Sequence, residues 1–194
     1  PAPLVGEPID AQKLQTLGDQ GILAMVCDST NVFQEGTSGS EGDVRENLKS
    51  IIGAHKKGKI FVTCFASNLA RLETISLAAQ EAGRRVVLLG RSFERMVEVA
   101  RANGYLQSVP QFVSVEIAAS MPSHKVLYLC SGSQGEARAA LSRIANKMMR
   151  NVTIQEGDVV LFSSRVIPGN DRSINAVKNK LIRLGVHVVT RHDL

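Results

Sequence analysis

Small polar residues and glycines gather at five places along the chain, each directly after a short apolar run. These places are Asp28-Ser29-Thr30-Asn31, Phe65-Ala66-Ser67-Asn68, Gly90-Arg91-Ser92, Ser131-Gly132-Ser133-Gln134-Gly135-Glu136 and Ser163-Ser164-Arg165. Hydroxyls, side-chain amides and backbone N–H groups at helix starts are the groups that bind phosphate. One such loop alone is more often only a helix cap or a turn. Five in succession favour a phosphate-binding edge, to which Arg91 adds a positive charge.

The segment Ser131–Glu136 is the strongest single candidate, because its two glycines let the backbone approach an anion. It is not a dinucleotide fingerprint: the Gly132–Gly135 spacing is G-x-x-G, and it follows the fourth apolar run rather than the first. No Walker A lysine follows it either. A stand-alone Rossmann-like nucleotide-binding module is therefore disfavoured, and it stays as an alternative.

Asp28 differs from the other loop residues because it is the one acid placed directly after an apolar run. A carboxylate at the end of a buried strand is well placed for general acid–base chemistry or for orienting another group. An Asp that only caps the following turn explains the position equally well. The sequence alone leaves both readings open.

The elements that must position these loops alternate between strands and helices. Continuous apolar runs predict strands at Ile22–Cys27, Ile60–Cys64, Arg85–Leu89, Val126–Cys130, Val159–Phe162 and His187–Thr190. Helical patterns cover Glu41–His55, Leu69–Ala82, Phe93–Asn103, Glu136–Lys147 and Arg172–Leu184, with Gly83, Gly104 and Gly185 as expected stops. The alternation predicts an α/β fold: a doubly wound, mainly parallel Rossmann-like sheet with helices on both faces.

Composition is ordinary for a soluble globular protein. The 194 residues include 44% hydrophobic and 21% charged residues, and the net charge of +5 leans towards an anionic partner. No apolar run approaches a membrane span, and no signal peptide is visible. The chain lacks an initiator Met, which suggests a fragment or a processed chain. Cys27, Cys64 and Cys130 each close an apolar run, so we expect buried, reduced thiols in a cytoplasmic protein.

Taken in order, these loops and Ile167-Pro168-Gly169-Asn170 resemble the β-CASP domain of bacterial ribonuclease J, in the metallo-β-lactamase superfamily. The resemblance runs from about Gly18 to the end. It implies a linker over residues 1–20, coming from a metallo-β-lactamase domain absent from this chain, and a β-CASP domain over residues 21–194. Ala137 and Gly39 stand where the family usually has proline.

The resemblance implies the RNA-binding portion of a metal-dependent ribonuclease with 5′-to-3′ exonuclease and endonuclease activity in RNA maturation and decay. Two zinc (or manganese) ions are expected in the full-length enzyme, where a metal pair stabilises the attacking and leaving oxygens. By position, Asp28 matches an acid that takes part in proton handling. The expected RNA- or phosphate-binding residues are Ser29, Thr30, Asn31, Phe65, Ala66, Ser67, Asn68, Arg91, Ser92, Ser131, Gly132, Ser133, Gln134, Gly135, Glu136, Ser163 and Ser164.

No metal site can be named in this chain, because the family's HxHxDH motif and later ligands are missing from it. His55 and His124 are expected to be isolated and solvent-facing, His187 to lie at a strand edge and His192 in a loop. We expect this chain alone to bind RNA weakly and to cleave nothing. The resemblance also raises homo-oligomerisation through Ile117–Met121, where core packing is the stronger expectation, and a nuclease acting on DNA.

Overall fold

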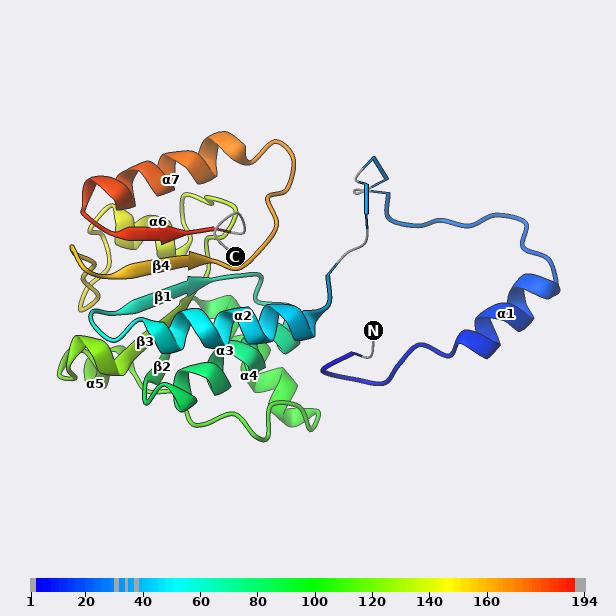
Figure 1. Cartoon of the computed structure of the whole chain (residues 1–194), viewed down its shortest axis with the longest axis horizontal. Coiled ribbons are helices and arrows are strands. Elements are labelled where there is room, and N and C mark those ends of the chain that lie inside the picture. The colour runs from blue at the N-terminus through cyan, green and yellow to red at the C-terminus, as the bar shows by residue number, and fades with distance from the viewer. Residues whose placement is uncertain (1–2, 30–31, 34, 37–38, 191–194) are drawn as a thin grey trace.

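Five short parallel strands form the centre of the protein (Figure 1). The computed structural model describes residues 3–29, 32–33, 35–36 and 39–190. The strands are β1 (Ile60–Thr63), β2 (Arg85–Leu89), β3 (Val126–Cys130), β4 (Val159–Phe162) and β5 (His187–Val189). They pair in the order β2-β3-β1-β4-β5. The predicted fold class and five of the six predicted strands are confirmed.

Both faces of the sheet are buried. Every residue of β1, β3 and β4 is buried. Successive side chains of a strand point to opposite faces, so Val62 and Leu129 belong to one core cluster whereas Phe61 and Tyr128 belong to the other. Phe61 and Tyr128 are paired across β1 and β3, and their rings stack with centroids 4.8 Å apart. This burial on both faces explains why the strands are uninterrupted apolar runs.

The helices cover the two faces in two groups. One core cluster contains buried residues of α2 (Glu41–Ala54), α3 (Leu69–Glu81) and α4 (Arg91–Ala102). The other contains those of α5 (Val115–Ala119), α6 (Ala140–Ala145) and α7 (Asp171–Arg183). A 3-10 turn over Ser123–Lys125 leads into β3. Gly83, Gly104 and Gly185 follow α3, α4 and α7 with positive φ, which confirms the predicted helix stops.

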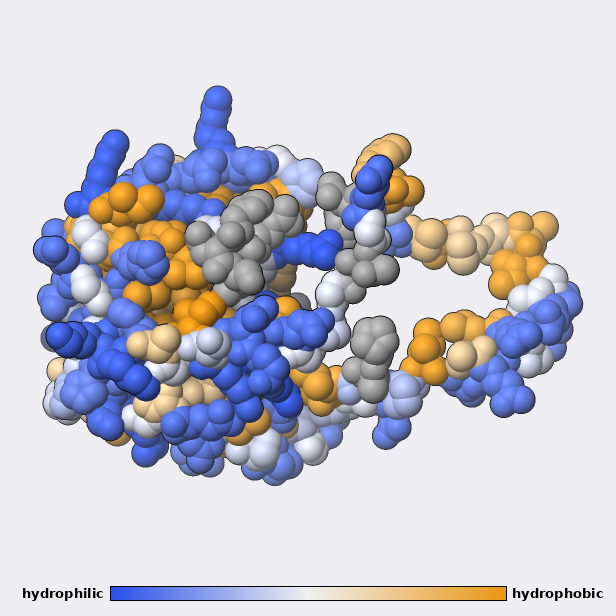
Figure 2. All heavy atoms as spheres, viewed as in Figure 1, coloured by the Kyte–Doolittle hydropathy of each residue, from blue (hydrophilic) through white to orange (hydrophobic). Residues whose placement is uncertain are grey.

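The N-terminal part of the chain differs most from expectation. Helix α1 (Ala11–Asp19) lies within the segment predicted as a linker, and it contains no buried residue. No strand forms over Ile22–Cys27, where Leu23 and Val26 are fully exposed. The strand prediction was wrong because an apolar run becomes a strand only beside a partner for its backbone hydrogen bonds. This segment extends away from the sheet in Figure 1, and its apolar side chains are uncovered in Figure 2.

The three cysteines are all free. Cys64 and Cys130 are buried as predicted, whereas Cys27 is exposed. The prediction failed for Cys27 because it lies on the segment that does not join the sheet. Among the described residues, no helix combines the length and the apolar character needed to cross a bilayer.

Candidate nucleic-acid interface

The carboxyl ends of the strands lie along one edge of the sheet, which we call the strand-end rim (residues 64–68, 90–92, 131–136 and 163–165). The register places Thr63 of β1 beside Cys130 of β3 and Phe162 of β4, so the loops after these strands start side by side. After β1 the chain continues into α3 on one face, and after β3 into α6 on the other. Ligands of doubly wound sheets bind where neighbouring connections diverge in this way. After β4 the chain continues into α7, also on that other face, so the rim on both sides of β1 is the candidate site.

Ser131 fixes the start of the loop after β3. Its N–H donates to the Leu89 carbonyl at 3.2 Å, and its carbonyl accepts from Leu141 N–H at 2.9 Å. Its hydroxyl accepts from Ala140 N–H at 3.3 Å. These contacts join the ends of β2 and β3 to the first turn of α6. The N–H, the carbonyl and the hydroxyl of Ser131 therefore all form hydrogen bonds within the protein.

The predicted helix over Glu136–Lys147 is wrong at both ends, because α6 spans only Ala140–Ala145. Gly135 explains the late start. Its φ is +76°, and a Cβ there would overlap the Ser173 carbonyl carbon and lie 2.6 Å from Ile174 N. The loop is thus pressed against the first turn of α7 and cannot begin a helix at Glu136. The sequence predicted helix N–H groups at Glu136 that face a phosphate. No helix begins at Glu136, so these N–H groups are not at a helix start.

Gln134 uses its side chain inside the protein, where it is 5% exposed. Its Nε2 donates to the Arg165 carbonyl at 2.9 Å and to Ser164 Oγ at 3.4 Å. Its Oε1 accepts from Ile167 N–H at 2.9 Å and from Asn170 Nδ2 at 3.2 Å. Gln134 therefore ties the loop after β3 to the loop after β4 and shapes the rim from within.

Two further residues predicted to bind phosphate are also turned inwards. Ser133 is 3% exposed, and Gly132 is buried beside Leu141. Glu136 is exposed, and its carboxylate accepts from the Gln134 N–H at 3.0 Å. The loop is therefore held by internal contacts, and Glu136 is a polar group that it exposes.

Arg71, which was not singled out from the sequence, joins three elements at the rim. Its guanidinium forms a bidentate pair with Glu41 of α2, at 2.6 and 3.0 Å. The same group donates to the carbonyl and the hydroxyl of Ser163 at 2.6 and 2.7 Å. Ser163 is thereby occupied by protein contacts. The sequence signal was a cation in the first turn of α3, where the helix dipole disfavours it unless a carboxylate compensates.

The side chains that remain exposed on the rim come mainly from the loops after β1 and β2. Phe65 is 37% exposed, and Ser67, Arg91 and Ser92 are also exposed. Ala66 and Asn68 are half-buried, and Asn68 caps α3 by accepting from Arg71 N–H at 3.0 Å. An exposed aromatic ring beside exposed hydroxyls and a guanidinium can stack a base and bind a phosphate.

Exposed arginines extend this surface. Arg138, which was not singled out from the sequence, and Arg165 of the predicted loop Ser163-Ser164-Arg165 are exposed on the loops after β3 and β4. Ser164 is half-buried between them and Gln134. With Arg71 neutralised by Glu41, the exposed positive charge resides on Arg91 and Arg165 of the rim and on Arg138, two residues beyond it.

Asp28 and Ser29 do not belong to the rim loops in the way predicted. Both are exposed and lie on the extended segment before α2, with no strand before them. Figure 1 shows this segment joining α2 on the same side as the strand carboxyl ends. Thr30 and Asn31 lie outside the described residues.

The buried thiols at the rim are chemically quiet. Burial raises the pKa of Cys64 to about 12, with the nearby Arg71 charge opposing and Glu41 reinforcing that rise. Burial also raises the pKa of Cys130, whose thiol donates to the Val62 carbonyl at 3.6 Å. A thiol held protonated is a poor nucleophile and a poor metal ligand. Within the described residues, no group of three or more His, Cys, Asp or Glu side chains lies together that could hold a metal ion.

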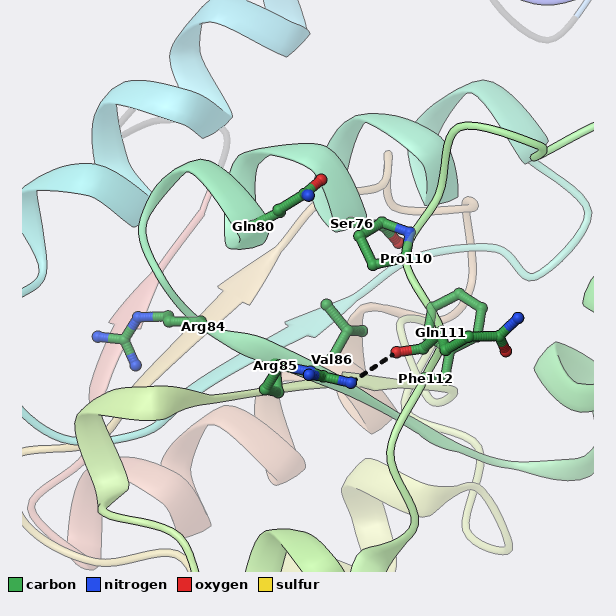
Figure 3. A pocket seen from close by; sticks show the side chains of 8 residues that line it. All are labelled: Ser76, Gln80, Arg84, Arg85, Val86, Pro110, Gln111 and Phe112. Carbon is green, nitrogen blue, oxygen red and sulfur yellow. Dashed lines mark hydrogen bonds between the residues drawn. The ribbon is translucent and has the colours of Figure 1, made fainter.

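Cavities occur away from the rim. One of about 290 Å³ lies against the β2 edge beneath the strap 110–112 (Figure 3). A second, of about 190 Å³, and a third, of about 340 Å³, meet at His55 at the amino end of the sheet. His124 is exposed as predicted, and His187 lies on β5 at the edge of the sheet, also as predicted. His192 lies outside the described residues. His55 is half-buried and shares the second cavity with His124, so the prediction that both are isolated was wrong: helix ends distant in sequence converge there.

The doubly wound parallel sheet, whose connections diverge on either side of β1, defines a Rossmann-like domain. Comparison with known proteins identifies the family to which this domain belongs. Residues 57–181 match the family described as Ribonuclease J, beta-CASP domain. The chain therefore belongs to the β-CASP domain family of ribonuclease J.

Relatives that carry the name Ribonuclease J match nearly the whole chain. Identity is 45% over 188 residues to the protein of Sinorhizobium meliloti, covering 97% of this chain and 33% of that protein. It is 40% over 190 residues to that of Corynebacterium glutamicum (97% and 26%) and 35% over 189 residues to that of Thermus thermophilus (97% and 33%). The chain thus spans a third or less of these relatives.

Proposed function

We propose that this chain supplies the RNA-binding surface of a metal-dependent ribonuclease, with RNA lying along the strand-end rim. The observation that carries the proposal is the divergence of the connections on either side of β1 in a chain that belongs to the ribonuclease J β-CASP family. Phe65 offers an exposed ring for base stacking, and Arg91, Arg138 and Arg165 offer charge for phosphates. The buried polar network of Gln134 and Arg71 holds these loops in place.

Hydrolysis of the phosphodiester is proposed for the full-length protein. The described residues do not fit a metal site, so zinc or manganese would be held by residues elsewhere in the protein, in a metallo-β-lactamase domain. Asp28 is proposed to assist proton transfer there, which its exposed position before α2 permits. The free buried thiols of Cys64 and Cys130 support a reducing, cytoplasmic setting.

A nucleotide-binding Rossmann module is the second candidate function, and nothing in the comparisons supports it. The loop after β1, where a dinucleotide fingerprint would lie, contains no glycine. Saturable nucleotide binding that RNA does not displace would favour it.

The test is a fluorescence titration with short RNA carrying a 5′-monophosphate or a 5′-hydroxyl, at low and moderate salt. We expect salt-sensitive binding. Phe65→Ala combined with Arg91→Ala should weaken it by roughly tenfold or more, because a stacking contact and a phosphate contact are both lost. Arg150→Ala is the charge control, since this exposed residue follows α6, far from the rim.

Equal weakening by Arg150→Ala, or no binding at low salt, would contradict the placement of RNA on the rim. A DNA oligonucleotide of the same sequence that binds equally well would shift the substrate class to DNA. Cleavage by this chain with added zinc or manganese, surviving Asp28→Ala, would show that no other metal-binding part is needed.

A further inference from the structure

A basic cavity lies at the opposite edge of the sheet from the strand-end rim. This amino-edge cavity has a volume of about 190 Å³ and is lined by His55, Lys56, Arg84, His124 and Lys125 together with apolar and glycine residues. None of the described residues that line it carries a carboxylate. We propose that the amino-edge cavity binds a phosphate group. The proposal goes beyond the RNA surface described above and does not depend on it.

Arg84 is the first support, because it is a buried cation without a counter-ion. It is 4% exposed, and it donates to the carbonyls of His55, Gly58 and Val126. Among the described residues no carboxylate forms an ion pair with it. Burial lowers its pKa. In Figure 3 its guanidinium points away from the other side chains of the β2-edge cavity. A buried charge that is hydrogen-bonded but not neutralised stabilises an anion placed beside it.

The C-termini of two helices at this edge repel an anion, but the cationic side chains carry more charge than these helix ends do. Helices α2 and α3 end here, at Ala54 and Glu81, and each C-terminus carries roughly half a negative charge. Lys56, Arg84 and Lys125 together carry three formal positive charges. A positive excess of roughly two charges therefore remains.

Neighbouring carboxylates reduce this excess but do not cancel it. Glu81 pairs with Lys49 at 3.1 Å. Asp158 accepts from the backbone N–H groups of Lys59 and Gln155, at 2.8 and 3.0 Å. Glu81 is therefore neutralised, whereas Asp158 keeps its negative charge near His55, so a net positive charge of about one remains.

His55 supplies a polar atom that has no partner. Its Nε2 is buried and makes no hydrogen bond with the described residues. Burial and then the Arg84 charge lower its pKa, His187 lowers it slightly, and the Gly157 backbone and Asp158 oppose that change. The ring is therefore neutral at pH 7, and an anion placed against Nε2 would favour its protonated, donating form.

The size of the cavity indicates the ligand class. Sites for drug-sized ligands usually occupy roughly 300–1,000 Å³, so about 190 Å³ suits one or two phosphate groups rather than a whole nucleotide. The phosphate could come from a small anion, such as inorganic phosphate or pyrophosphate, or from the backbone of bound RNA. The same experiment separates these sources.

The experiment follows the histidine ring signals of the whole chain by NMR while inorganic phosphate replaces chloride at constant ionic strength. We expect saturable shifts of the His55 and His124 signals and a rise in the pKa of His55. Lys56→Ala with Lys125→Ala should weaken phosphate binding by at least roughly tenfold. Lys13→Ala with Arg95→Ala removes the same charge at exposed helix positions outside the lining and should change the affinity by less than about twofold.

The source is read by adding pyrophosphate or a short RNA with 5′-hydroxyl ends to the phosphate-bound protein. Displacement at His55 by RNA assigns the cavity to the nucleic-acid backbone, and displacement by pyrophosphate alone assigns it to a small anion. The proposal is overturned if phosphate produces no saturable shift at His55. Equal weakening in the two double variants, with both folded by their unfolding curves, would overturn it as well.

Discussion

At the scale of single residues, Gln134 and Arg71 show that the polar groups of the rim divide into two kinds. The side-chain amide of Gln134 hydrogen-bonds to the loop after β4, and the guanidinium of Arg71 hydrogen-bonds to Glu41 and Ser163. Phe65 and Arg91 remain exposed. Gln134 and Arg71 hold the loops of the rim in place, whereas the side chains of Phe65 and Arg91 are available to a ligand.

Replacement of Gln134 should therefore act on stability. We expect Gln134→Ala to lower the free energy of unfolding by about 3 kcal/mol, because the Arg165 carbonyl and the Ile167 N–H lose their partner in a buried setting. Urea unfolding measures the change. Gln80→Ala is the control, since Gln80 is exposed and should cost less than about 0.5 kcal/mol. Equal effects of the two substitutions would show that the Gln134 hydrogen bonds contribute little.

The buried thiols should make stability fall in alkali. The pKa of Cys64 is raised by burial to about 12, and that of Cys130 is also raised. The unfolded thiol ionises above its ordinary value of 9.0 while the folded thiol stays protonated. The native state then binds more protons, so this contribution is complete below pH 9 and is lost as the pH rises through the folded value.

Between pH 8 and pH 10 we expect a loss of about 1.4 kcal/mol for each buried thiol. Urea unfolding at the two pH values tests this. Cys64→Ala should reduce the pH-dependent loss by about half, whatever its effect on absolute stability. Cys27→Ala should leave the loss unchanged because Cys27 is exposed. An unchanged loss in Cys64→Ala would contradict the assignment.

At the scale of elements, the contact between the loop after β3 and helix α7 decides the shape of the rim. Gly135 lies directly against the backbone of Ser173 and Ile174. This close approach allows Gln134 to reach the loop after β4, and it delays the start of α6. A side chain at position 135 would therefore disturb three elements together.

Gly135→Ala should lower the free energy of unfolding by about 3 kcal/mol or more, through positive φ and backbone overlap. Gly169→Ala separates the two causes. Gly169 has a φ of +94°, but apart from its two chain neighbours no described residue lies within 4 Å of the place that an added methyl group would occupy. Its replacement should therefore cost only about 1–2 kcal/mol of backbone strain. Thermal or urea unfolding compares them. A Gly135→Ala loss no larger than that of Gly169→Ala would show that α7 moves away readily.

At the scale of the whole molecule, the N-terminal segment and the α/β domain differ in how much they contribute to stability. Helix α1 buries nothing, and a nine-residue helix without tertiary contacts is marginal in water. The domain begins at the capping box of α2, where Ser40 and Asp43 exchange hydrogen bonds at 2.9 and 3.1 Å.

Removal of residues 1–38 should therefore change the free energy of unfolding by less than about 0.5 kcal/mol. Removal of residues 1–43 is the contrasting deletion, because it also takes away the α2 cap and Glu41, the partner of Arg71. It should cost about 3 kcal/mol or more. Urea unfolding of both shortened chains provides the measurement. A large loss from the first deletion would mean that the N-terminal segment stabilises the domain.

The sequence by itself determined the α/β class, five strands, the helix stops at Gly83, Gly104 and Gly185, and the loops that share the rim. These features follow from local periodicity, from glycine at positive φ and from the geometry of parallel strands. The family resemblance rested on the same loops, and the comparisons confirmed it.

Only the tertiary structure decided which polar groups are exposed, where α6 begins, and whether Ile22–Cys27 forms a strand. Each depends on partners distant in sequence: Gln134 on Arg165, Arg71 on Ser163, Gly135 on Ser173. The amino-edge cavity likewise joins His55, Arg84 and His124 from separate connections. A local pattern fixes the type of side chain, whereas burial and hydrogen-bond partners are properties of the assembled fold, and they decide what the side chain can bind.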